Sequence, residues 1–299
     1  MSEPVAANAL ALRAPAKVNL DLRVLGVRPD GYHEIETLLV RLHIADRIEL
    51  RPGPRGLRLH SAGSDAGLVE GLPSGEENLC CRAARIFFRA LGREPALTIR
   101  LEKRIPIAAG LGGGSSDAAA VLGGLNRRAG APFARERILE MAAELGSDVP
   151  FFALDQPAAV ARGRGERLES VAPPPSRPVL IVVPDFGVSA AEAYRWWDAG
   201  PPGDPGETPR WTGTEGPPSW REIAHAARND LAPGVERRHP ILARVRANLA
   251  ETGAAPALLC GSGSCVAGVF DTEAERDAAG RRLAAESDLP DGWRLIETR

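Results

Sequence analysis

The residues best suited to chemistry in this sequence form a glycine-rich stretch, IPIAAGLGGGSSDAAAVL, at residues 105–122. Residues 97–101 before it alternate between apolar and polar, the period of a half-buried strand, and residues 118–125 after it are strong helix formers. Glycines between a strand and a helix let the backbone take positive φ angles and approach a ligand closely. We expect Ser115, Ser116 or Asp117 to cap this helix, whose N-terminal N–H groups and positive dipole end would suit a polyphosphate.

This loop differs from two other phosphate-binding patterns. A P-loop requires a lysine after its last glycine, whereas Ser115 follows Gly114. A dinucleotide fingerprint would place a third glycine at Ser115, and no N-terminal βαβ unit precedes the stretch. A flexible linker is the remaining alternative, but a linker has no reason to end in a capped, alanine-rich helix. The loop therefore predicts a nucleotide phosphate site.

Two lysines and one aspartate are further candidates for chemistry. Lys17 and Lys103 are the only lysines among 37 basic residues. A GC-rich genome explains the arginine bias but not which lysines remain, and lysine supplies a compact charge on a flexible stem. Lys103 lies a few residues before the glycine loop, where a cation would be useful. Asp148 lies between a helix end at Gly146 and an apolar run, where it is either a carboxylate held in place or a helix-capping or turn residue.

The segment around Lys17 is predicted to be a strand with one polar face. Residues 18–24 alternate, which places Lys17, Asn19 and Asp21 opposite the apolar side chains. For Asp21 and Arg23 we interpret this as a solvated surface. The turn RPDGYH at residues 28–33 then presents an aromatic and a histidine at the start of the next strand, residues 34–42, where they either pack or clamp a planar ring.

The remaining patterns predict an α+β protein with two domains. Asn78 is expected to cap a helix that ends near residue 90, and further helices are expected at residues 135–145, 220–227, 240–252 and 273–286. Residues 46–59 are interpreted as strand pairs around the turn at 51–54, and residues 159–166 as a hairpin. The second half begins with a buried strand at residues 179–183. A proline-rich joint at residues 171–178 predicts the domain boundary, with domains 1–170 and 171–299.

Composition excludes several classes of function. The net charge of −2 over 299 residues argues against a general nucleic-acid or membrane-surface binder. No apolar run is long enough to span a bilayer, and the first 17 residues lack a signal-peptide pattern, so the cytoplasm is the expected location. The four cysteines have no C-x-x-C spacing and form no metal-type cluster with the histidines, which predicts buried or free thiols.

Six motifs together resemble one kinase superfamily. They are PAKVNL at residues 15–20, RPDGYH at 28–33, the glycine loop at 106–116, LGSDVP at 145–150, RNDL at 228–231 and CGSGSC at 260–265. In this order, over nearly the whole chain, they are similar to the galactokinase, homoserine kinase, mevalonate kinase and phosphomevalonate kinase (GHMP kinase) superfamily. PAKVNL with DGYH resembles the members that act on a cytidine diphosphate ester of methylerythritol.

The resemblance implies a fold and a reaction. The fold would combine an N-terminal domain like the second domain of ribosomal protein S5 with a ferredoxin-like C-terminal domain, and the active site would lie in the cleft between them. The reaction would be ATP-dependent phosphorylation of the 2-hydroxyl of 4-diphosphocytidyl-2-C-methylerythritol, with Mg²⁺, in the non-mevalonate route to isoprenoids. The partner would be this small molecule, with no nucleic acid or membrane, and the chain would be a monomer or a weak homodimer.

The resemblance also implies roles for individual residues. Asp148 would be the general base, and Lys17 would orient the acceptor hydroxyl and stabilise negative charge. The cytidine diphosphate end would be held by Asn19, Tyr32 and His33. The ATP site would comprise Asn78, Lys103, Pro106, Ile107, Ala108, Ala109, Gly110, Leu111, Gly112, Gly113, Gly114, Ser115 and Ser116.

Four points remain open at this level. A second aromatic over the cytosine is either Tyr194 or Trp196. Ser116 is a possible magnesium ligand by superfamily analogy, and no magnesium carboxylate can be named. The second glycine loop, at residues 261–264, either contacts substrate phosphates or makes a tight turn. Residues 199–218, dense in glycine and proline, are expected to form an irregular surface loop without an assigned function.

Overall fold

A computed structural model describes residues 9–63, 71–201, 211, 216–285 and 289–299. The chain divides into two compact units that interleave along the sequence. Unit 1 comprises residues 1–16, 44–107 and 112–155, and unit 2 comprises residues 17–43, 108–111 and 156–299. Two long strands, β1 (Leu10–Val27) and β2 (His33–Pro52), contribute residues to both units. The boundary at residue 170 stays a prediction.

The sheet of unit 1 departs from the predicted hairpin. In this unit β2 pairs antiparallel with β4 (Ala96–Lys103), and β4 pairs parallel with β3 (Gly56–Gly63). The expectation that residues 46–59 pair across the turn at 51–54 is therefore wrong, because β4 lies between the two strands. Backbone bonds from Gly53 N to Ala96 O (3.0 Å) and from Gly56 N to Pro95 O (2.7 Å) direct the turn onto the start of β4.

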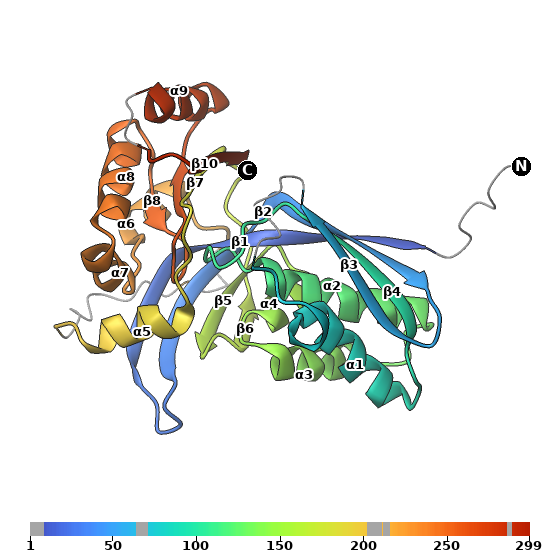
Figure 1. The fold of residues 1–299 in the computed structure, drawn as a ribbon. Coiled ribbons are helices and arrows are strands. Elements are labelled where there is room, and N and C mark those ends of the chain that lie inside the picture. Colours follow the sequence, from blue (N-terminus) through green and yellow to red (C-terminus); the bar gives the residue numbers. More distant parts are fainter. Residues whose placement is uncertain (1–8, 64–70, 202–210, 212–215, 286–288) are drawn as a thin grey trace, which may run out of the picture. The chain divides into compact units, whose positions relative to one another are not determined.

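Helices of unit 1 lie on one side of these strands (Figure 1). They are η2 (Gly75–Glu77), α1 (Leu79–Leu91), α2 (Gly113–Arg128), α3 (Arg135–Leu145) and α4 (Val149–Ala153). A Cβ added to Gly124 of α2 would lie 2.6 Å from Leu12 Cδ1 and 3.0 Å from Leu50 Cδ1. Glycine is needed here for α2 to pack this close to β1 and β2, and this packing fixes the helix that follows the glycine loop.

Two predicted helix starts have different outcomes. Asn78 is the N-cap of α1, as predicted, and its Oδ1 accepts a hydrogen bond from Cys80 N at 2.9 Å. In contrast, α2 begins five residues earlier than its alanine run, with Gly112 as N-cap and no side-chain cap. The prediction that Ser115, Ser116 or Asp117 caps this helix is therefore wrong.

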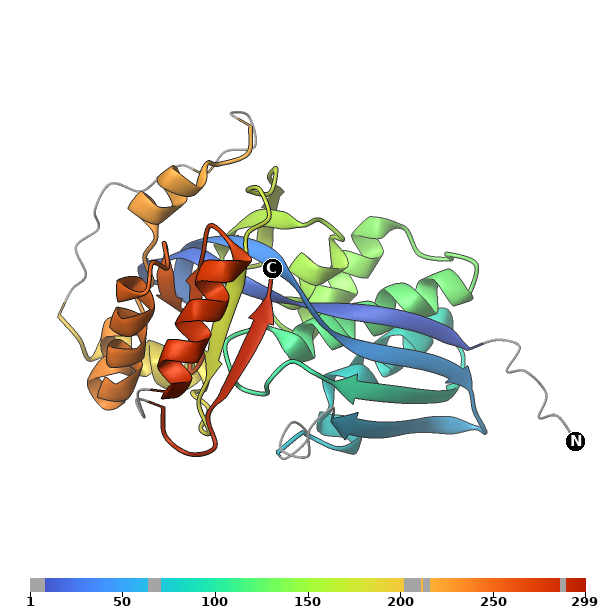
Figure 2. The same ribbon diagram turned by 90° about the horizontal axis from the view of Figure 1, so that it is seen from above.

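Unit 2 contains the predicted hairpin and a second sheet. Strands β5 (Ala158–Gly163) and β6 (Arg167–Ser170) pair antiparallel, and β5 also pairs with residues 35–40 of β2. The second sheet is antiparallel with the order β10-β7-β9-β8, and Figure 2 shows α9 lying along β7. These elements are β7 (Val179–Val183), α5 (Ala190–Asp198), α6 (Trp220–Ala226), α7 (Ala232–Arg238), α8 (Pro240–Glu251), β8 (Ala257–Leu259), β9 (Val266–Val269), α9 (Glu273–Ala285) and β10 (Arg294–Thr298).

One core holds unit 2 together. Leu180 and Val182 of β7 are fully buried, with Leu242, Val245 and Leu249 of α8 in the same cluster. Helix α7 has seven residues, starts beside a proline and was not predicted from the sequence. Most of the loop predicted at residues 199–218 lies outside the described residues.

Candidate active site

The glycine loop has the backbone geometry that its composition predicts. Gly110 and Gly112 have φ angles of +76° and +72°, in the left-handed region that favours glycine. A Cβ on Gly113 would lie 3.0 Å from Ile105 Cγ2 and 3.2 Å from Lys103 Nζ. Because no side chain caps α2, its first N–H groups, which have no intrahelical partner, can bind an anion.

Lys103 has a different environment from the one expected of a phosphate ligand. It is 1% exposed, and its ammonium donates hydrogen bonds to Asp46 and, at 2.8 Å, to Asp117 Oδ2. Asp46 Oδ1 also accepts from the backbone N–H groups of Arg104 (2.6 Å) and Ile105 (2.9 Å). This charged cluster ties the end of β4 to β2 and to the second turn of α2, so Lys103 helps to fix both ends of the glycine loop.

The pKa values of the charged cluster follow from burial and from its two carboxylates. Burial raises the pKa of Asp117 to about 7; the Lys103 charge opposes this shift and the Asp46 charge adds to it. Burial alone would lower the pKa of Lys103, but attraction by Asp117 and Asp46 outweighs it and raises that pKa. The lysine is therefore charged at neutral pH.

Two further unit 1 residues predicted at the ATP site lie near the start of α1 and α2. Asn78 is buried, and besides capping α1 it donates from Nδ2 to Pro73 O at 2.9 Å. A Cβ on Gly114 would lie 3.5 Å from Leu79 Cδ1, which places the start of α1 beside the loop. Ser116 Oγ is buried and has no hydrogen-bond partner in the described part of the chain.

Asp148 lies in the position that its sequence context predicts. It precedes α4 as the N-cap residue, but its side chain makes no capping hydrogen bond. Its neighbours Val149 and Pro150 are buried, whereas Asp148 is half-buried. The side chain thus does not cap α4, whereas the turn position that was the other part of this alternative is present, so the two interpretations of Asp148 stay open. Helix α4 packs against α2, which holds the aspartate in the same unit as the start of that helix.

Lys17 lies in unit 2, where it contacts the middle of the glycine loop. Its backbone N–H donates to Leu111 O at 2.9 Å. Lys17 is only 4% exposed. Its ammonium donates a hydrogen bond to Asn19 Oδ1 at 2.8 Å. Asn19 Nδ2 in turn donates to Thr37 Oγ1 at 2.9 Å, and that hydroxyl donates to Asp21 O at 2.6 Å. We call Lys17, Asn19 and Thr37 the neutral chain, because the hydrogen bonds that link these three residues are accepted by an amide oxygen and a hydroxyl oxygen.

The solvated surface predicted for Asp21 and Arg23 is wrong. These residues are only 1% and 5% exposed, and Arg23 Nε donates to Asp21 Oδ2 at 3.1 Å. Trp211, from the predicted surface loop, donates from Nε1 to the same oxygen at 3.2 Å. Burial raises the pKa of Asp21 despite the opposing charge of Arg23. Alternation along a strand cannot show that another segment covers its polar face.

The second glycine loop is a tight turn that packs on the first. Gly263 N donates to Cys260 O at 2.7 Å, which closes the turn as one of the two alternatives predicted. A Cβ on Gly110 would lie 1.7 Å from Cys260 O, and one on Gly261 would lie 3.2 Å from Lys17 Nζ. Both loops therefore require glycine where they meet.

Tyr194 and Trp196, the two aromatics left open by the sequence, contact different histidines of unit 2. His33 stacks on Tyr194 with ring centroids 4.5 Å apart, and Asp198 Oδ1 lies 2.8 Å from His33 Nε2. Trp196 instead lies against His239, with centroids 5.8 Å apart. Of the two aromatics left open by the sequence, Tyr194 is the one beside His33.

Tyr32 lies at an exposed turn. It is 54% exposed, and the Arg164 guanidinium lies 4.7 Å from its ring centroid. Arg164 was missed because no local pattern connects the β5–β6 hairpin with this turn. Asp46, Asp117 and Thr37 were missed for the same reason, although each lies close in sequence to a predicted site residue or strand.

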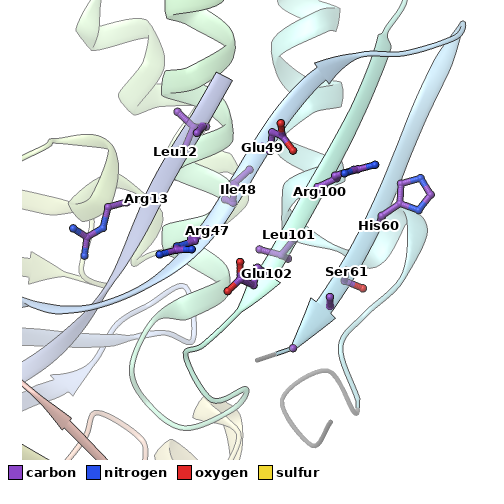
Figure 3. Close-up of a pocket in the computed structure, with 13 residues that line it drawn as sticks. Leu12, Arg13, Arg47, Ile48, Glu49, His60, Ser61, Arg100, Leu101 and Glu102 are labelled. Carbon is purple, nitrogen blue, oxygen red and sulfur yellow. The ribbon is translucent and has the colours of Figure 1, made fainter. Parts of the chain in front are cut away.

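A pocket of about 760 Å³ lies on the sheet of unit 1. Figure 3 shows Arg47, Glu49, Arg100 and Glu102 on this sheet. Opposite charges face each other across β2 and β4, as Arg47 with Glu102 and Glu49 with Arg100. Such cross-strand pairs are typical of a solvated sheet face, and no predicted site residue lines the pocket.

Family models match both halves of the chain. The GHMP kinases N terminal domain matches residues 78–161, and the GHMP kinases C terminal domain matches residues 217–288. Each model matches one side of the boundary predicted at residue 170. The fold, the glycine loop and these two matches define a small-molecule kinase of the GHMP class. The predicted α+β GHMP kinase fold is therefore confirmed.

Relatives over almost the whole length narrow this class. A 4-diphosphocytidyl-2-C-methyl-D-erythritol kinase from Pelotomaculum thermopropionicum is 43% identical over 92% of this chain and 94% of its own. A kinase of the same name from Geobacter metallireducens is 37% identical over 97% of this chain and 98% of its own length. A crystal structure of 4-(cytidine 5'-diphospho)-2C-methyl-D-erythritol kinase matches with a TM-score of 0.76 at 34% identity, covering 97% of this chain and 98% of that one. The chain belongs to the 4-diphosphocytidyl-2-C-methyl-D-erythritol kinase family.

A more distant structure shares the fold alone. Homoserine kinase from Cytophaga hutchinsonii matches with a TM-score of 0.72 at 17% identity, covering 100% of this chain and 97% of its own. None of the helices in the described part of the chain combines the length and apolar character that a membrane span needs.

Proposed function

We propose that this protein transfers the γ-phosphoryl group of ATP to the 2-hydroxyl of 4-diphosphocytidyl-2-C-methyl-D-erythritol, in the methylerythritol phosphate pathway of isoprenoid synthesis. The observation that carries this proposal is the contact of Lys17 with the glycine loop, at Leu111, on the strand that leads to the Tyr32–His33 turn. One segment thereby connects a phosphate loop with a cluster suited to a planar base. The family relatives carry the same activity in their names.

The glycine loop would hold the ATP phosphates. Positive φ angles at Gly110 and Gly112 and the uncapped start of α2 give a cradle of backbone N–H groups. Asn78 caps the neighbouring helix and would shape the nucleotide side of the site. In this proposal Lys103 acts from beneath the loop, through the charged cluster, rather than as a direct phosphate ligand.

Mg²⁺ fits this site through oxygen ligands. Ser116 Oγ, buried and without a partner among the described residues, is a suitable ligand atom. Within the described ranges, no group of three or more His, Cys, Asp or Glu side chains could hold a metal, so phosphate oxygens and water would complete the shell. When bound, the ion supplies charge neutralisation for phosphoryl transfer.

Lys17 and Asp148 would provide the chemistry at the acceptor hydroxyl. Asp148 would accept the hydroxyl proton as the oxygen attacks the γ-phosphorus, and ADP would leave. Lys17, oriented by Asn19, would hold the attacking oxygen and stabilise negative charge beside it. Phosphoryl transfer requires mainly this kind of positioning and charge stabilisation.

The cytidine end of the substrate would bind among the aromatics of unit 2. Tyr32 would stack on cytosine, with Tyr194 as the second aromatic because it lies against His33. His33 would bond the base, and Asp198, 2.8 Å from its Nε2, would set the orientation of the imidazole ring. Asn19 would complete the substrate contacts.

Location and assembly follow from the same proposal. All four cysteines are buried and unbridged, which is consistent with a reducing cytoplasm. We expect a monomer or a weak homodimer, without a nucleic-acid or membrane partner.

ADP release by the purified protein tests the proposed function. With ATP and magnesium present, turnover is compared for 4-diphosphocytidyl-2-C-methyl-D-erythritol, mevalonate, homoserine and galactose. Turnover with the cytidyl acceptor alone is the expected result. Turnover with another acceptor would keep the phosphate loop but overturn the substrate, and no turnover with any of the four would favour a nucleotide-binding protein without catalysis.

A further inference from the structure

The RNDL motif at residues 228–231 has no role in the reaction proposed above, yet its asparagine is among the most constrained side chains of unit 2. Asn229 is buried, and its Nδ2 donates to Leu259 O at 2.9 Å and to Gly261 O at 2.7 Å. Its Oδ1 accepts from Leu231 N at 3.0 Å. Both amide protons and the amide oxygen are therefore engaged, which fixes the side chain in one orientation.

The backbone of the same motif is attached to β1. Leu22 N donates to Arg228 O at 2.7 Å, and Asp230 N donates to Leu22 O at 3.0 Å. Asp230 Oδ2 accepts from Val24 N at 2.9 Å. Asn229 therefore connects the strand that carries Lys17 with the second glycine loop.

The carbonyl that Asn229 holds belongs to the residue next to the lysine. Gly261 has a φ angle of +52°, and a Cβ on it would lie 3.2 Å from each of Lys17 Nζ, Asn19 Oδ1 and Gly110 O. The backbone of the second glycine loop thus forms one wall of the space that the ammonium occupies. A displacement of this backbone would change the volume available to the lysine head group.

We propose that Asn229 is a positioning residue for Lys17. It holds the Gly261 backbone against the ammonium, so that Lys17 stays on Asn19 Oδ1 and aims at the acceptor oxygen. The inference rests on the proposed function for what Lys17 does, but the contacts themselves are independent of the substrate. Its consequence is that a change at Asn229 lowers kcat while substrate and ATP affinities are kept.

Asn229→Asp is the sharpest variant, because it keeps the shape and the acceptor oxygen but replaces the donor by a carboxylate oxygen facing two carbonyls. Asn126 offers a matched control in unit 1, since its Nδ2 donates to Phe133 O at 2.9 Å and its Oδ1 accepts from Phe133 N at 3.1 Å. Asn126→Asp makes the same chemical change at a loop that takes no part in the proposed site.

Steady-state kinetics of the full chain, with the cytidyl acceptor and ATP varied separately, tests the inference. We expect Asn229→Asp to lower kcat by about tenfold or more with both KM values within about threefold, and Asn126→Asp to keep kcat. In a Lys17→Arg background the effect of Asn229→Asp should shrink to less than about twofold, because residues that act through one another are not additive. Equal kcat in the two Asn→Asp variants, or a full tenfold effect in the Lys17→Arg background, would overturn it.

Two controls keep the result interpretable. If Asn229→Asp does not fold, Asn229→Ser removes the same donor without adding a charge and is expected to show the same pattern in kcat. The wild-type rate with the cytidyl acceptor, measured in the same assay, tests the proposed function separately. Wild-type turnover with an unaffected Asn229→Ser would therefore defeat the positioning role alone.

Discussion

The two lysines of this chain lie in two different kinds of buried environment. Lys103, in unit 1, donates to the carboxylates of Asp46 and Asp117. Lys17, in unit 2, donates to the amide oxygen of Asn19, with the backbone of Gly261 alongside. Carboxylates cancel the charge of a lysine and fix it as part of the fold, which predicts a structural role for Lys103. Lys17 lies where the two glycine loops meet, through its contacts with Leu111 and Gly261, and this position predicts a catalytic role.

The largest expected effect separates the lysines by activity. Lys17→Met should lower kcat by at least about 10²-fold, because it removes the charge that stabilises the transition state, while ATP binding survives. Steady-state rates and equilibrium ATP titration measure the two quantities. Wild-type turnover in this variant would remove Lys17 from the mechanism and with it the contrast between the lysines.

Asp148 extends the comparison to the carboxylates. Asp148→Asn should lower kcat by about 10²–10⁴-fold, since an amide cannot accept the hydroxyl proton. Asp46→Asn, with a buried carboxylate that bonds backbone N–H groups, serves as the control that should affect stability more than the rate. An Asp148→Asn enzyme with normal kcat would exclude the proposed general base.

Stability should show the structural role of Lys103. Lys103→Met leaves the two buried carboxylates of Asp46 and Asp117 without their cation and should lower the free energy of unfolding by about 3–5 kcal/mol. Urea unfolding measures this loss, and a Lys103→Met variant as stable as the wild type would contradict the structural role of the charged cluster.

Substitution of the aromatic residues of unit 2 should have a smaller effect, on the KM for the cytidyl substrate. Tyr194→Ala should raise KM for the cytidyl substrate about tenfold with little change in KM for ATP, because stacking of a base on an aromatic contributes about 1–3 kcal/mol. Trp196→Ala, whose ring lies against His239, should leave that KM close to wild type. A larger KM effect for Trp196→Ala would reverse the assignment.

A further expected effect is a pH dependence of the stability that the charged cluster provides. Because burial raises the pKa of Asp117 from 3.8 to about 7, the native state binds this proton more tightly than the unfolded chain does. That stabilisation is fully present below about pH 3.8 and is lost as the pH rises through about 7. Asp117→Asn cannot ionise, so its stability relative to wild type should increase between about pH 5 and about pH 8 in urea unfolding. A constant difference would mean that Asp117 does not titrate in this range.

Sequence patterns predicted most elements and the class of site. The period of two at Leu97, Ile99 and Leu101 correctly gave β4, and Asn78 correctly marked the start of α1. The sequence patterns gave wrong predictions where strand pairing or burial depended on a segment far away in the sequence. The strand partner of β3 was wrong because β4 pairs with it from some 40 residues further along the chain, and Asp21 is buried although its alternation resembles that of a solvated face.

The sequence by itself determined the glycine loop, its position between a strand and a helix, and the family. These properties depend on local composition and spacing, which a chain keeps in any context. Only the tertiary structure decided that Lys103 is neutralised, because the carboxylates of the charged cluster lie 57 residues before and 14 residues after Lys103. It also decided that Tyr194 rather than Trp196 meets His33. Burial of a charge is stable only with a partner, and folding, not spacing along the chain, brings that partner into place.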